Sequence, residues 1–364
     1  MGIDRREIGH FDFPLLALAA ALVGIGLLSL YSGSYSATGR SAEYFGSQLF
    51  WLAVGTVAMM VAIVFDYRFT ARIAYIIYGI NIVLLALTHL IGFGEAEVGS
   101  NRWLDFGFFY LQPSDTMQLA LVVALAKFFQ EYGRPPPYSL AELKIPFVLI
   151  AIPFMLTAAE PDLGSALFFP LMGLSIVFVA GLDIRSLLGL AGITIVALPF
   201  AYFKLLTAYQ QRRMLMFFNP EQPYQVRWSK VAIGSGRFWG KGFLGGTQTR
   251  GDYVPNAHND FIFSVIGEEW GFVGCGFVLG LYFMFLFYGV GVATQAREKY
   301  GTLLAIGIVA LFFWHIVINL GGVLGIMPVT GVTLPLISYG GTSLVTMMIG
   351  LGLLLNISMR RFVF

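Results

Sequence analysis

The chain consists of apolar stretches long enough to cross a membrane, separated by mostly short polar segments. About 20 apolar residues in a helix span the hydrocarbon core of a bilayer, so each stretch predicts a membrane-spanning helix. Ten such stretches are expected, over residues 13–31, 49–65, 73–93, 114–129, 145–159, 166–181, 187–206, 272–294, 303–326 and 336–357. The pattern predicts an all-α membrane protein in which residues 1–364 form a single polytopic domain.

One polar segment, residues 207–270, joins the seventh and eighth stretches and is much longer than the others. Long loops in compact proteins are usually either functional or disordered. Aromatic residues argue against disorder here and favour attachment to the membrane surface: Trp228, Phe238, Trp239, Phe243, Tyr253 and Phe261. Residues 226–236 predict a short amphipathic helix in the membrane interface. We call residues 207–270 the long loop.

Composition supports the membrane class and excludes several functions. Hydrophobic residues make up 57% of the chain, charged residues make up 12%, and there are 43 glycines. A soluble enzyme, a disordered protein or a nucleic-acid-binding protein does not fit so few charges, whereas abundant glycine suits close helix packing in lipid. The one cysteine, Cys275, lies in an apolar run, so neither an intrachain disulfide nor a Cys/His metal cluster is expected.

The distribution of basic residues predicts the orientation. More than half of the 22 Lys and Arg residues lie in segments on the side of the N-terminus, whereas the short loops on the other side hold only Arg40 and Arg102. The positive-inside rule therefore predicts cytoplasmic termini in the cytoplasmic membrane, with the long loop outside, because long translocated loops escape the rule. The first apolar stretch is too long for a typical signal-peptide core, so we expect it to be retained as a span.

The long loop combines basic side chains with glycines. Its cations, counted from the end of the seventh stretch, are Lys204, Arg212, Arg213, Arg227, Lys230, Arg237, Lys241 and Arg250. Cations at a membrane surface attract phosphate groups, and glycines let backbone N–H groups approach an anion closely. The loop therefore indicates a diphosphate site, with a plain solvated loop as the alternative.

Asp260 lies where the long loop enters the eighth apolar region, two residues after His258. Such a pair suits acid–base chemistry. Asn259 and Asp260 also suit the start of a helix, because their side chains cap free backbone N–H groups. The local sequence supports both interpretations.

Two further polar pairs are expected on the same outer side. Asp115 and Gln118 lie three residues apart near the start of the fourth stretch and share a helix face, although a helix start also explains the acid. Glu160 and Asp162 lie in a tight turn. A turn alone accounts for Asp162 but does not require Glu160.

The last third of the chain holds two unusual features. His315 and Asn319 lie four residues apart on one face of the ninth stretch, which is more typical of a polar contact between helices than of a proton relay. Residues 325–341 contain Pro328, Pro335 and several glycines. This segment predicts a broken, re-entrant stretch, which is tolerated at membrane depth only where it is buried or lines a cavity.

Taken together, these motifs resemble the SEDS family (shape, elongation, division and sporulation) over nearly the whole chain. The runs that carry the resemblance are Asn101–Leu104, Gln112–Ser114, Ala159–Gly164, Tyr209–Arg213, Ser229–Gly236, Gly240–Gly242, Gly246–Gln248, His258–Phe263 and Pro335–Gly341. The resemblance implies ten spans and polymerisation of lipid II into peptidoglycan glycan strands. It implies a class B penicillin-binding protein as partner, and it puts Asp260 at the position of the family's essential aspartate.

Polymerisation of lipid II needs a base on the acceptor 4-hydroxyl and positive charge on the departing diphosphate. The resemblance makes Asp260 the candidate base. The candidate diphosphate-binding residues are Arg102, Arg212, Lys230, Arg237, Lys241 and His258. The supporting residues are Asp115, Gln118, Glu160 and Asp162, of which the last two are predicted to orient the acceptor or a divalent cation. No other cofactor is implied.

Two other functions stay open. A lipid II flippase needs charge along a transverse path, and the charges here gather on one face. A silent scaffold that activates its penicillin-binding partner is kept open by departures from the family, which usually has Glu at position 115 and Lys at position 118; this chain has Asp115 and Gln118, and Asn256 also departs.

Overall fold

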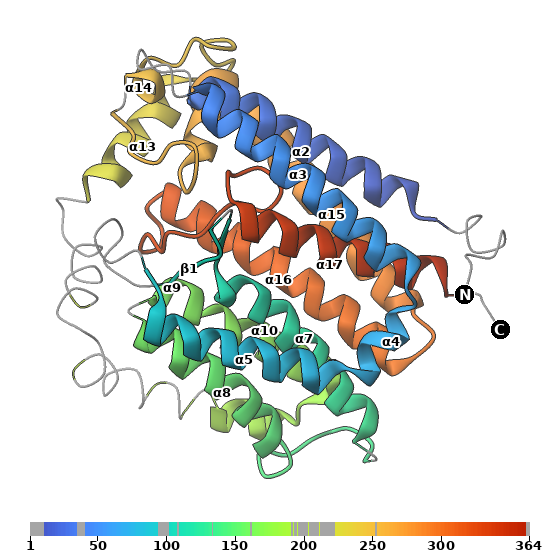
Figure 1. Cartoon of the computed structure of the whole chain (residues 1–364). Coiled ribbons are helices and arrows are strands. Elements are labelled where there is room, and N and C mark those ends of the chain that lie inside the picture. Colours follow the sequence, from blue (N-terminus) through green and yellow to red (C-terminus); the bar gives the residue numbers. More distant parts are fainter. Residues whose placement is uncertain are drawn as a thin grey trace. The chain divides into compact units, whose positions relative to one another are not determined.

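The computed structural model describes residues 11–34, 41–93, 102–107, 109–132, 134–160, 162–190, 223–251 and 253–361, together with residues 192, 195, 203 and 211. The described chain is mostly helical and divides into two compact units (Figure 1). The first unit comprises residues 1–67, 221–297 and 312–364, and the second comprises residues 68–220 and 298–311.

The first unit is built on long apolar helices. Its elements are α2 (Phe13–Gly33), α3 (Ser41–Val64), α13 (Tyr224–Ser235), α14 (Thr247–Arg250), α15 (Ile262–Gln295), α17 (Gly341–Met359) and the second half of α16 (Lys299–Val323). α3 packs along α17, and α2 packs along α15. These contacts are close because they use glycine: a Cβ atom at Gly341 would overlap Trp51, and one at Gly352 would overlap the Met59 carbonyl.

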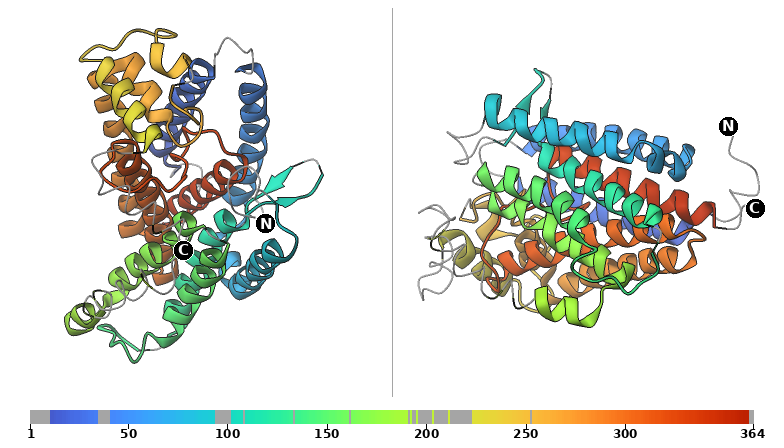
Figure 2. Two further views of the ribbon diagram at one scale, coloured as in Figure 1. Left: turned by 90° about the vertical axis from the view of Figure 1, so that its left-hand side faces the viewer. Right: turned by 90° about the horizontal axis from the view of Figure 1, so that it is seen from below.

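The second unit contains shorter helices and a small hairpin. Its elements are α4 (Tyr67–Arg72), α5 (Ala74–Ile91), α7 (Pro113–Glu131), α8 (Lys144–Ala159), α9 (Leu163–Ala166), α10 (Phe168–Gly181) and the first half of α16. β1 (Leu104–Asp105) and β2 (Tyr110–Leu111) form an antiparallel pair just before α7 (Figure 2). α7 packs against α5 and α10, and Gly307 lets α16 approach Val122 and Ile176.

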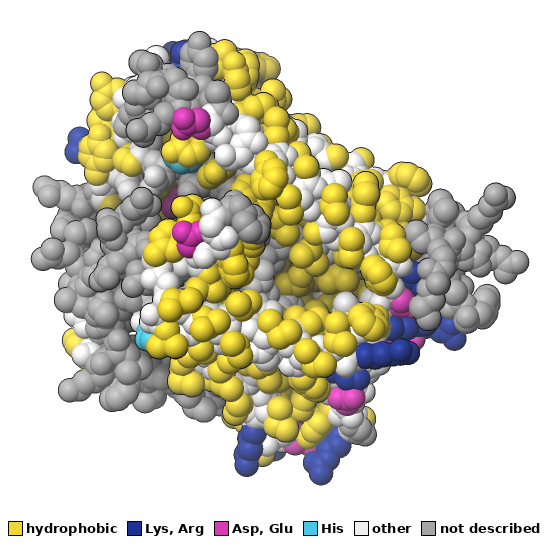
Figure 3. All heavy atoms as spheres, viewed as in Figure 1, with side chains coloured by type: hydrophobic (Ala, Val, Ile, Leu, Met, Phe, Trp, Pro, Cys, Tyr) yellow, Lys and Arg dark blue, Asp and Glu magenta, His cyan; other side chains and the backbone are white. Residues whose placement is uncertain are grey.

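Seven stretches of the described chain are long and apolar enough to cross a membrane: Phe13–Gly33, Glu43–Val64, Ala74–Ile91, Leu163–Gly181, Ile262–Gln295, Lys299–Val323 and Gly341–Met359. The fifth expected stretch is the shorter apolar helix α8, and the fourth is α7, which begins with polar residues. Most of the seventh lies outside the described residues. In Figure 3, hydrophobic side chains cover much of the face shown, as expected for helices in contact with lipid.

Three expected helix boundaries are wrong. The second helix begins eight residues early, at Ser41 rather than at residue 49. The last helix begins at Gly341 rather than at residue 336, because Leu336 follows a proline and adopts a positive φ of 64°. The eighth helix begins ten residues early, at Ile262, and is interrupted at Gly271, where φ is 66°. The charged pair Glu268 and Glu269 gave this first part the appearance of a loop. The short helix expected over residues 226–236 is confirmed as α13.

Candidate functional site

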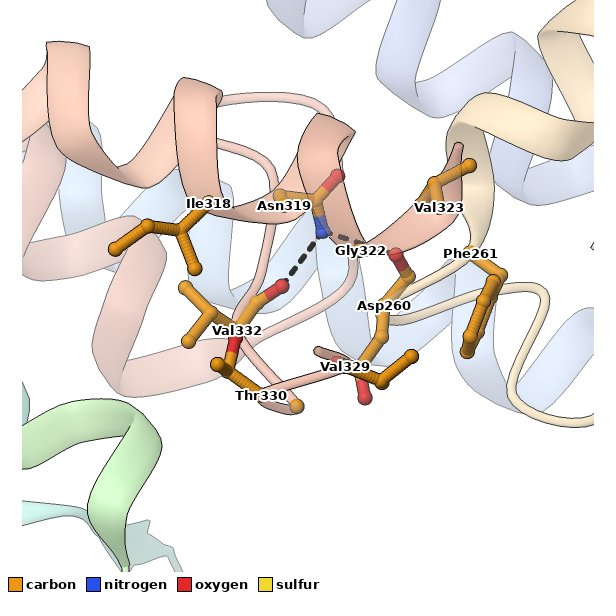
Figure 4. Close-up of a pocket in the computed structure, with 10 residues that line it drawn as sticks. Asp260, Phe261, Ile318, Asn319, Gly322, Val323, Val329, Thr330 and Val332 are labelled. Carbon is orange, nitrogen blue, oxygen red and sulfur yellow. Dashed lines mark hydrogen bonds between the residues drawn. The ribbon is translucent and has the colours of Figure 1, made fainter. Parts of the chain in front are cut away.

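Asp260 lies at the end of a non-helical segment, residues 253–261, that leads into α15. Its surroundings form a small pocket in the first unit that includes Asn319, Gly331 and Val332 (Figure 4). The N-cap position of α15 is Phe261, whose side chain makes no capping hydrogen bond, so neither Asn259 nor Asp260 occupies the N-cap position. The acid–base interpretation of Asp260 stays a prediction.

His258 is packed between aromatic rings. Its imidazole stacks on Tyr44 with ring centroids 4.3 Å apart and meets the edge of Tyr339 at 6.1 Å. Burial lowers the pKa of His258, so the ring is neutral at neutral pH. His258 therefore packs the Asp260 segment against Tyr44 and Tyr339, and its contact with the diphosphate stays a prediction.

Lys230 and Arg237 are exposed cations at α13. The Lys230 side chain lies over Gly325, where a Cβ atom would come within 2.8 Å of its Nζ atom. On the same non-helical segment, a Cβ atom at Gly331 would lie 3.6 Å from Oδ2 of Asp260. One short stretch, residues 325–331, thus borders both a candidate base and a candidate cation.

Lys241 is committed to an internal ion pair. Its Nζ atom lies 2.6 Å from Oε1 of Glu268, a carboxylate that is fully buried. The same carboxylate accepts hydrogen bonds from the backbone N–H groups of Thr247, Gln248 and Thr249 at 2.9–3.0 Å. The Thr249 hydroxyl adds a further bond of 2.9 Å. Glu268 therefore neutralises the Lys241 charge in this structure, and the diphosphate role of Lys241 stays a prediction.

The glycines of the long loop permit close packing on the start of α15. A Cβ atom at Gly236 would overlap the Gly267 carbonyl, and one at Gly240, where φ is 79°, would overlap the Glu269 carbonyl. Backbone bonds of 3.0 Å and 2.9 Å join Lys241 and Gly242 to the same two turns of α15. The glycine pattern was interpreted as an anion site. The anion found there is the protein's own Glu268.

A second group of expected residues lies together in the second unit. Nη1 of Arg102 is 3.4 Å from Oδ2 of Asp162, and both side chains are largely buried. Asp162 also caps α9, because it accepts bonds from the backbone and hydroxyl of Ser165 at 3.2 and 2.8 Å. Asp115, in the first turn of α7, is near enough to interact with the charges of Asp162 and Arg102.

Glu160 is buried beside this group and accepts a hydrogen bond from the Thr88 hydroxyl. Burial raises the pKa of Glu160 to about 7, an effect that Asp162 reinforces and that Thr88 and Arg102 oppose. Gln118 is buried on α7, and Arg212 lies outside the described residues. Within the part of the chain that the structure describes, no group of three His, Cys, Asp or Glu residues is arranged to hold a metal ion.

The structure also shows two functions of side chains that sequence reasoning did not predict. Glu268 organises the long loop, and Asn319 binds the backbone of Asp260. For Glu268, the only signal in the sequence was an acidic pair inside an otherwise apolar region. For Asn319, the signal was a polar position in a helix core, which was interpreted as a contact between helices.

Comparison with known proteins gives a consistent result. Residues 13–362 match the family of cell cycle proteins that comprises FtsW, RodA and SpoVE. The peptidoglycan glycosyltransferase MrdB of Escherichia coli strain K12 is 37% identical, with 97% of this chain and 94% of that protein aligned.

Solved structures are similar over the same length. A chain from a peptidoglycan synthase complex that coordinates polymerization and crosslinking is 32% identical, with a TM-score of 0.83 and coverage of 97% of this chain and 99% of that chain. The rod shape determining protein RodA of Thermus thermophilus is 30% identical, with a TM-score of 0.73 and coverage of 97% and 98%.

Proposed function

Because this chain belongs to the FtsW/RodA/SpoVE family of cell cycle proteins, we propose that it is a peptidoglycan glycosyltransferase that polymerises lipid II into glycan strands. The observation that carries the proposal is whole-length similarity to a named peptidoglycan glycosyltransferase, combined with a carboxylate, Asp260, that lines a pocket. The reaction takes place at the outer face of the cytoplasmic membrane.

The proposed chemistry is a single displacement. Asp260 removes the proton from the acceptor 4-hydroxyl as its oxygen bonds to the anomeric carbon of the donor sugar. The bond between that carbon and the diphosphate oxygen breaks, so configuration inverts. A diphosphate already leaves readily, and exposed cations at Lys230 and Arg237 stabilise its developing charge. No second carboxylic acid is needed, unlike in glycoside hydrolysis.

The second group of residues has a supporting role in this proposal. Arg102, held by Asp162, is a further cation suited to the diphosphate, and Asp115 and Glu160 set the local charge around it. Fixed cations are most effective where water is excluded, and Arg102 is largely buried. Gln118 supplies hydrogen bonds without charge at the position where the family usually has lysine.

A class B penicillin-binding protein is the proposed partner. The support is the similarity to a chain from a synthase complex that couples polymerization to crosslinking. Glycan strands become a wall only when transpeptidation joins them, so the two activities are needed at one place.

The test of the proposed function is Asp260→Asn. Purified protein is given fluorescent lipid II in detergent, and glycan polymer is measured on gels. Polymer from the unchanged protein is expected, since detergent removes any need for flipping. A positioned general base contributes about 10²–10⁴-fold to rate, so Asp260→Asn is expected to lower turnover by at least about 100-fold.

The matched control is Glu131→Gln, which neutralises a carboxylate whose side chain is 55% exposed at the end of α7. It is expected to keep full turnover. Absence of polymer from folded, unchanged protein would favour the flippase or scaffold alternatives. Near-normal polymer from Asp260→Asn would show that Asp260 is not the base.

A further inference from the structure

Three successive carbonyls of the Asp260 segment are each held by a donor from elsewhere in the first unit. The His258 carbonyl accepts from the backbone N–H of Tyr339 at 3.1 Å. The Asn259 carbonyl accepts from the Ser338 hydroxyl at 2.7 Å, and the Asp260 carbonyl accepts from Nδ2 of Asn319 at 2.9 Å. The broken segment before α17 and the end of α16 therefore fix the backbone that carries the candidate base.

Of these three donors, Asn319 is the one that binds the carbonyl of Asp260 itself. Its side chain is only 4% exposed, and the second hydrogen of its amide is donated to the Val332 carbonyl at 2.6 Å. Figure 4 shows both bonds diverging from the one nitrogen toward Asp260 and Val332. A single amide thus joins α16, the Asp260 segment and the residues bordering Gly331.

The chemistry of this position calls for asparagine. Both acceptors are backbone carbonyls, so the bridging group needs two hydrogens on one atom and no negative charge. Aspartate would present oxygen to two carbonyls, and leucine has a similar size but no donor. A glutamine side chain is longer by one methylene group, which does not fit the same span.

We propose that Asn319 is a positioning residue for Asp260, an inference that rests on the proposed function. By fixing the Asp260 carbonyl and the non-helical segment beside Gly331, it fixes the Cα atom from which the carboxylate projects. The carboxylate lies beside the Gly331 backbone, since a Cβ atom added at Gly331 would be 3.6 Å from Oδ2 of Asp260. A displacement of about 1 Å in a catalytic group costs about 10²-fold in rate, so the bridge acts on turnover and not on substrate binding.

The test compares Asn319→Leu with Asn356→Leu, a matched buried asparagine in the same unit. Asn356, on α17, donates to the carbonyls of Ala62, Ile63 and Phe65 at the end of α3, at distances of 2.6–2.9 Å. Both variants lose buried hydrogen bonds, so both are expected to lower the thermal unfolding temperature. Only Asn319→Leu is expected to lower kcat for glycan polymerisation, by about 10–100-fold, with little change in KM for lipid II.

A second variant covers the case in which Asn319→Leu does not fold. Ser338→Ala removes the bond to the Asn259 carbonyl and leaves the amide bridge in place, and it is expected to lower kcat in the same direction but less. Unchanged kcat in the folded variants, or an equal loss of kcat in Asn356→Leu, would overturn the positioning role.

Asp260→Asn, measured in the same experiment, separates this inference from the proposed function. If Asp260→Asn is inactive while Asn319→Leu keeps full kcat, the positioning inference alone is wrong. If the unchanged protein makes no polymer, or Asp260→Asn stays active, the proposed function is wrong and the inference falls with it.

Discussion

At the scale of single residues, Glu160 couples protonation to stability. Its pKa is about 7 in the folded protein against an ordinary value of 4.5, mainly because of burial. Between these values the folded chain holds a proton that the unfolded chain has lost, so the free energy of unfolding falls as pH rises through this window. The loss is at most about 3.5 kcal/mol, since the two pKa values differ by about 2.5 and one pKa unit corresponds to about 1.4 kcal/mol.

Glu160→Gln is therefore expected to flatten the pH dependence of stability. The variant should match the unchanged protein near pH 5 and exceed it by several degrees in unfolding temperature at pH 8. Thermal unfolding in detergent across this range is the measurement. Glu142→Gln is the control: hydrogen bonds from Ser139 and Arg134 lower the pKa of Glu142 to about 2, so its removal leaves the pH 5–8 slope unchanged. Parallel curves for Glu160→Gln would contradict the assignment.

The sequence indicated that Glu160 was unusual, because the surrounding turn does not require a second carboxylate. It did not indicate the partner. Thr88 lies 72 positions earlier on another helix, and nothing in the local pattern of either segment points to the other. The same holds for Asn319, whose spacing from His315 identified a polar helix face but not the carbonyl that it binds.

At the scale of elements, residues 237–251 of the long loop are held to α15 by backbone bonds and by the buried carboxylates of Glu268 and Glu269. Glu268→Gln removes the charge that pairs with Lys241 and weakens the bonds to Thr247, Gln248 and Thr249. The Lys241 side chain is 25% exposed, so water can hydrate its charge, and the cost of about 1–3 kcal/mol comes mainly from the lost hydrogen bonds of the buried carboxylate. We expect a lower unfolding temperature and faster proteolysis within residues 237–251.

The control for this prediction is Glu298→Gln. Glu298 pairs with Arg68 at 2.9 Å, but its side chain is 36% exposed, so the loss is expected to be below about 1 kcal/mol. Limited proteolysis with peptide mapping measures the loop directly. Equal cleavage in both variants would show that Glu268 does not hold the loop.

Element boundaries were predicted well where hydropathy changes and poorly where backbone geometry decides. The ends of α2 and α5 differ from the expected stretches by only a few residues. The start of α17 was missed because it depends on a positive φ at Leu336, which no periodicity reveals. The first turns of α15 were missed because Glu268 and Glu269 gave them the polarity of a loop. The glycines of the long loop allow close packing on α15, and the diphosphate site that they indicated stays a prediction.

At the scale of the whole molecule, helix content and family were predictable, because apolar stretches of spanning length depend only on composition along the chain. The orientation remains a prediction of the positive-inside rule. It is tested with single cysteines at Lys230→Cys, in α13, and Glu131→Cys, at the end of α7, in a Cys275→Ala background. A membrane-impermeant maleimide added to intact spheroplasts is expected to label position 230 and not position 131.

Permeabilised cells provide the control for this labelling, since both positions are exposed and should then react. Labelling of position 131 before permeabilisation, with position 230 protected, would reverse the orientation. It would also place Asp260 on the wrong side for lipid II that has already been exported.

The Glu268 carboxylate orders residues 247–249, a part of the long loop. Fixing one backbone residue costs about 1–2 kcal/mol of conformational entropy, and these three residues meet this cost during folding, when their N–H groups bind Glu268. A substrate that reaches this surface therefore docks on a template that is already ordered. We expect its association to resemble that of a rigid receptor, with little of the entropy loss that accompanies folding upon binding.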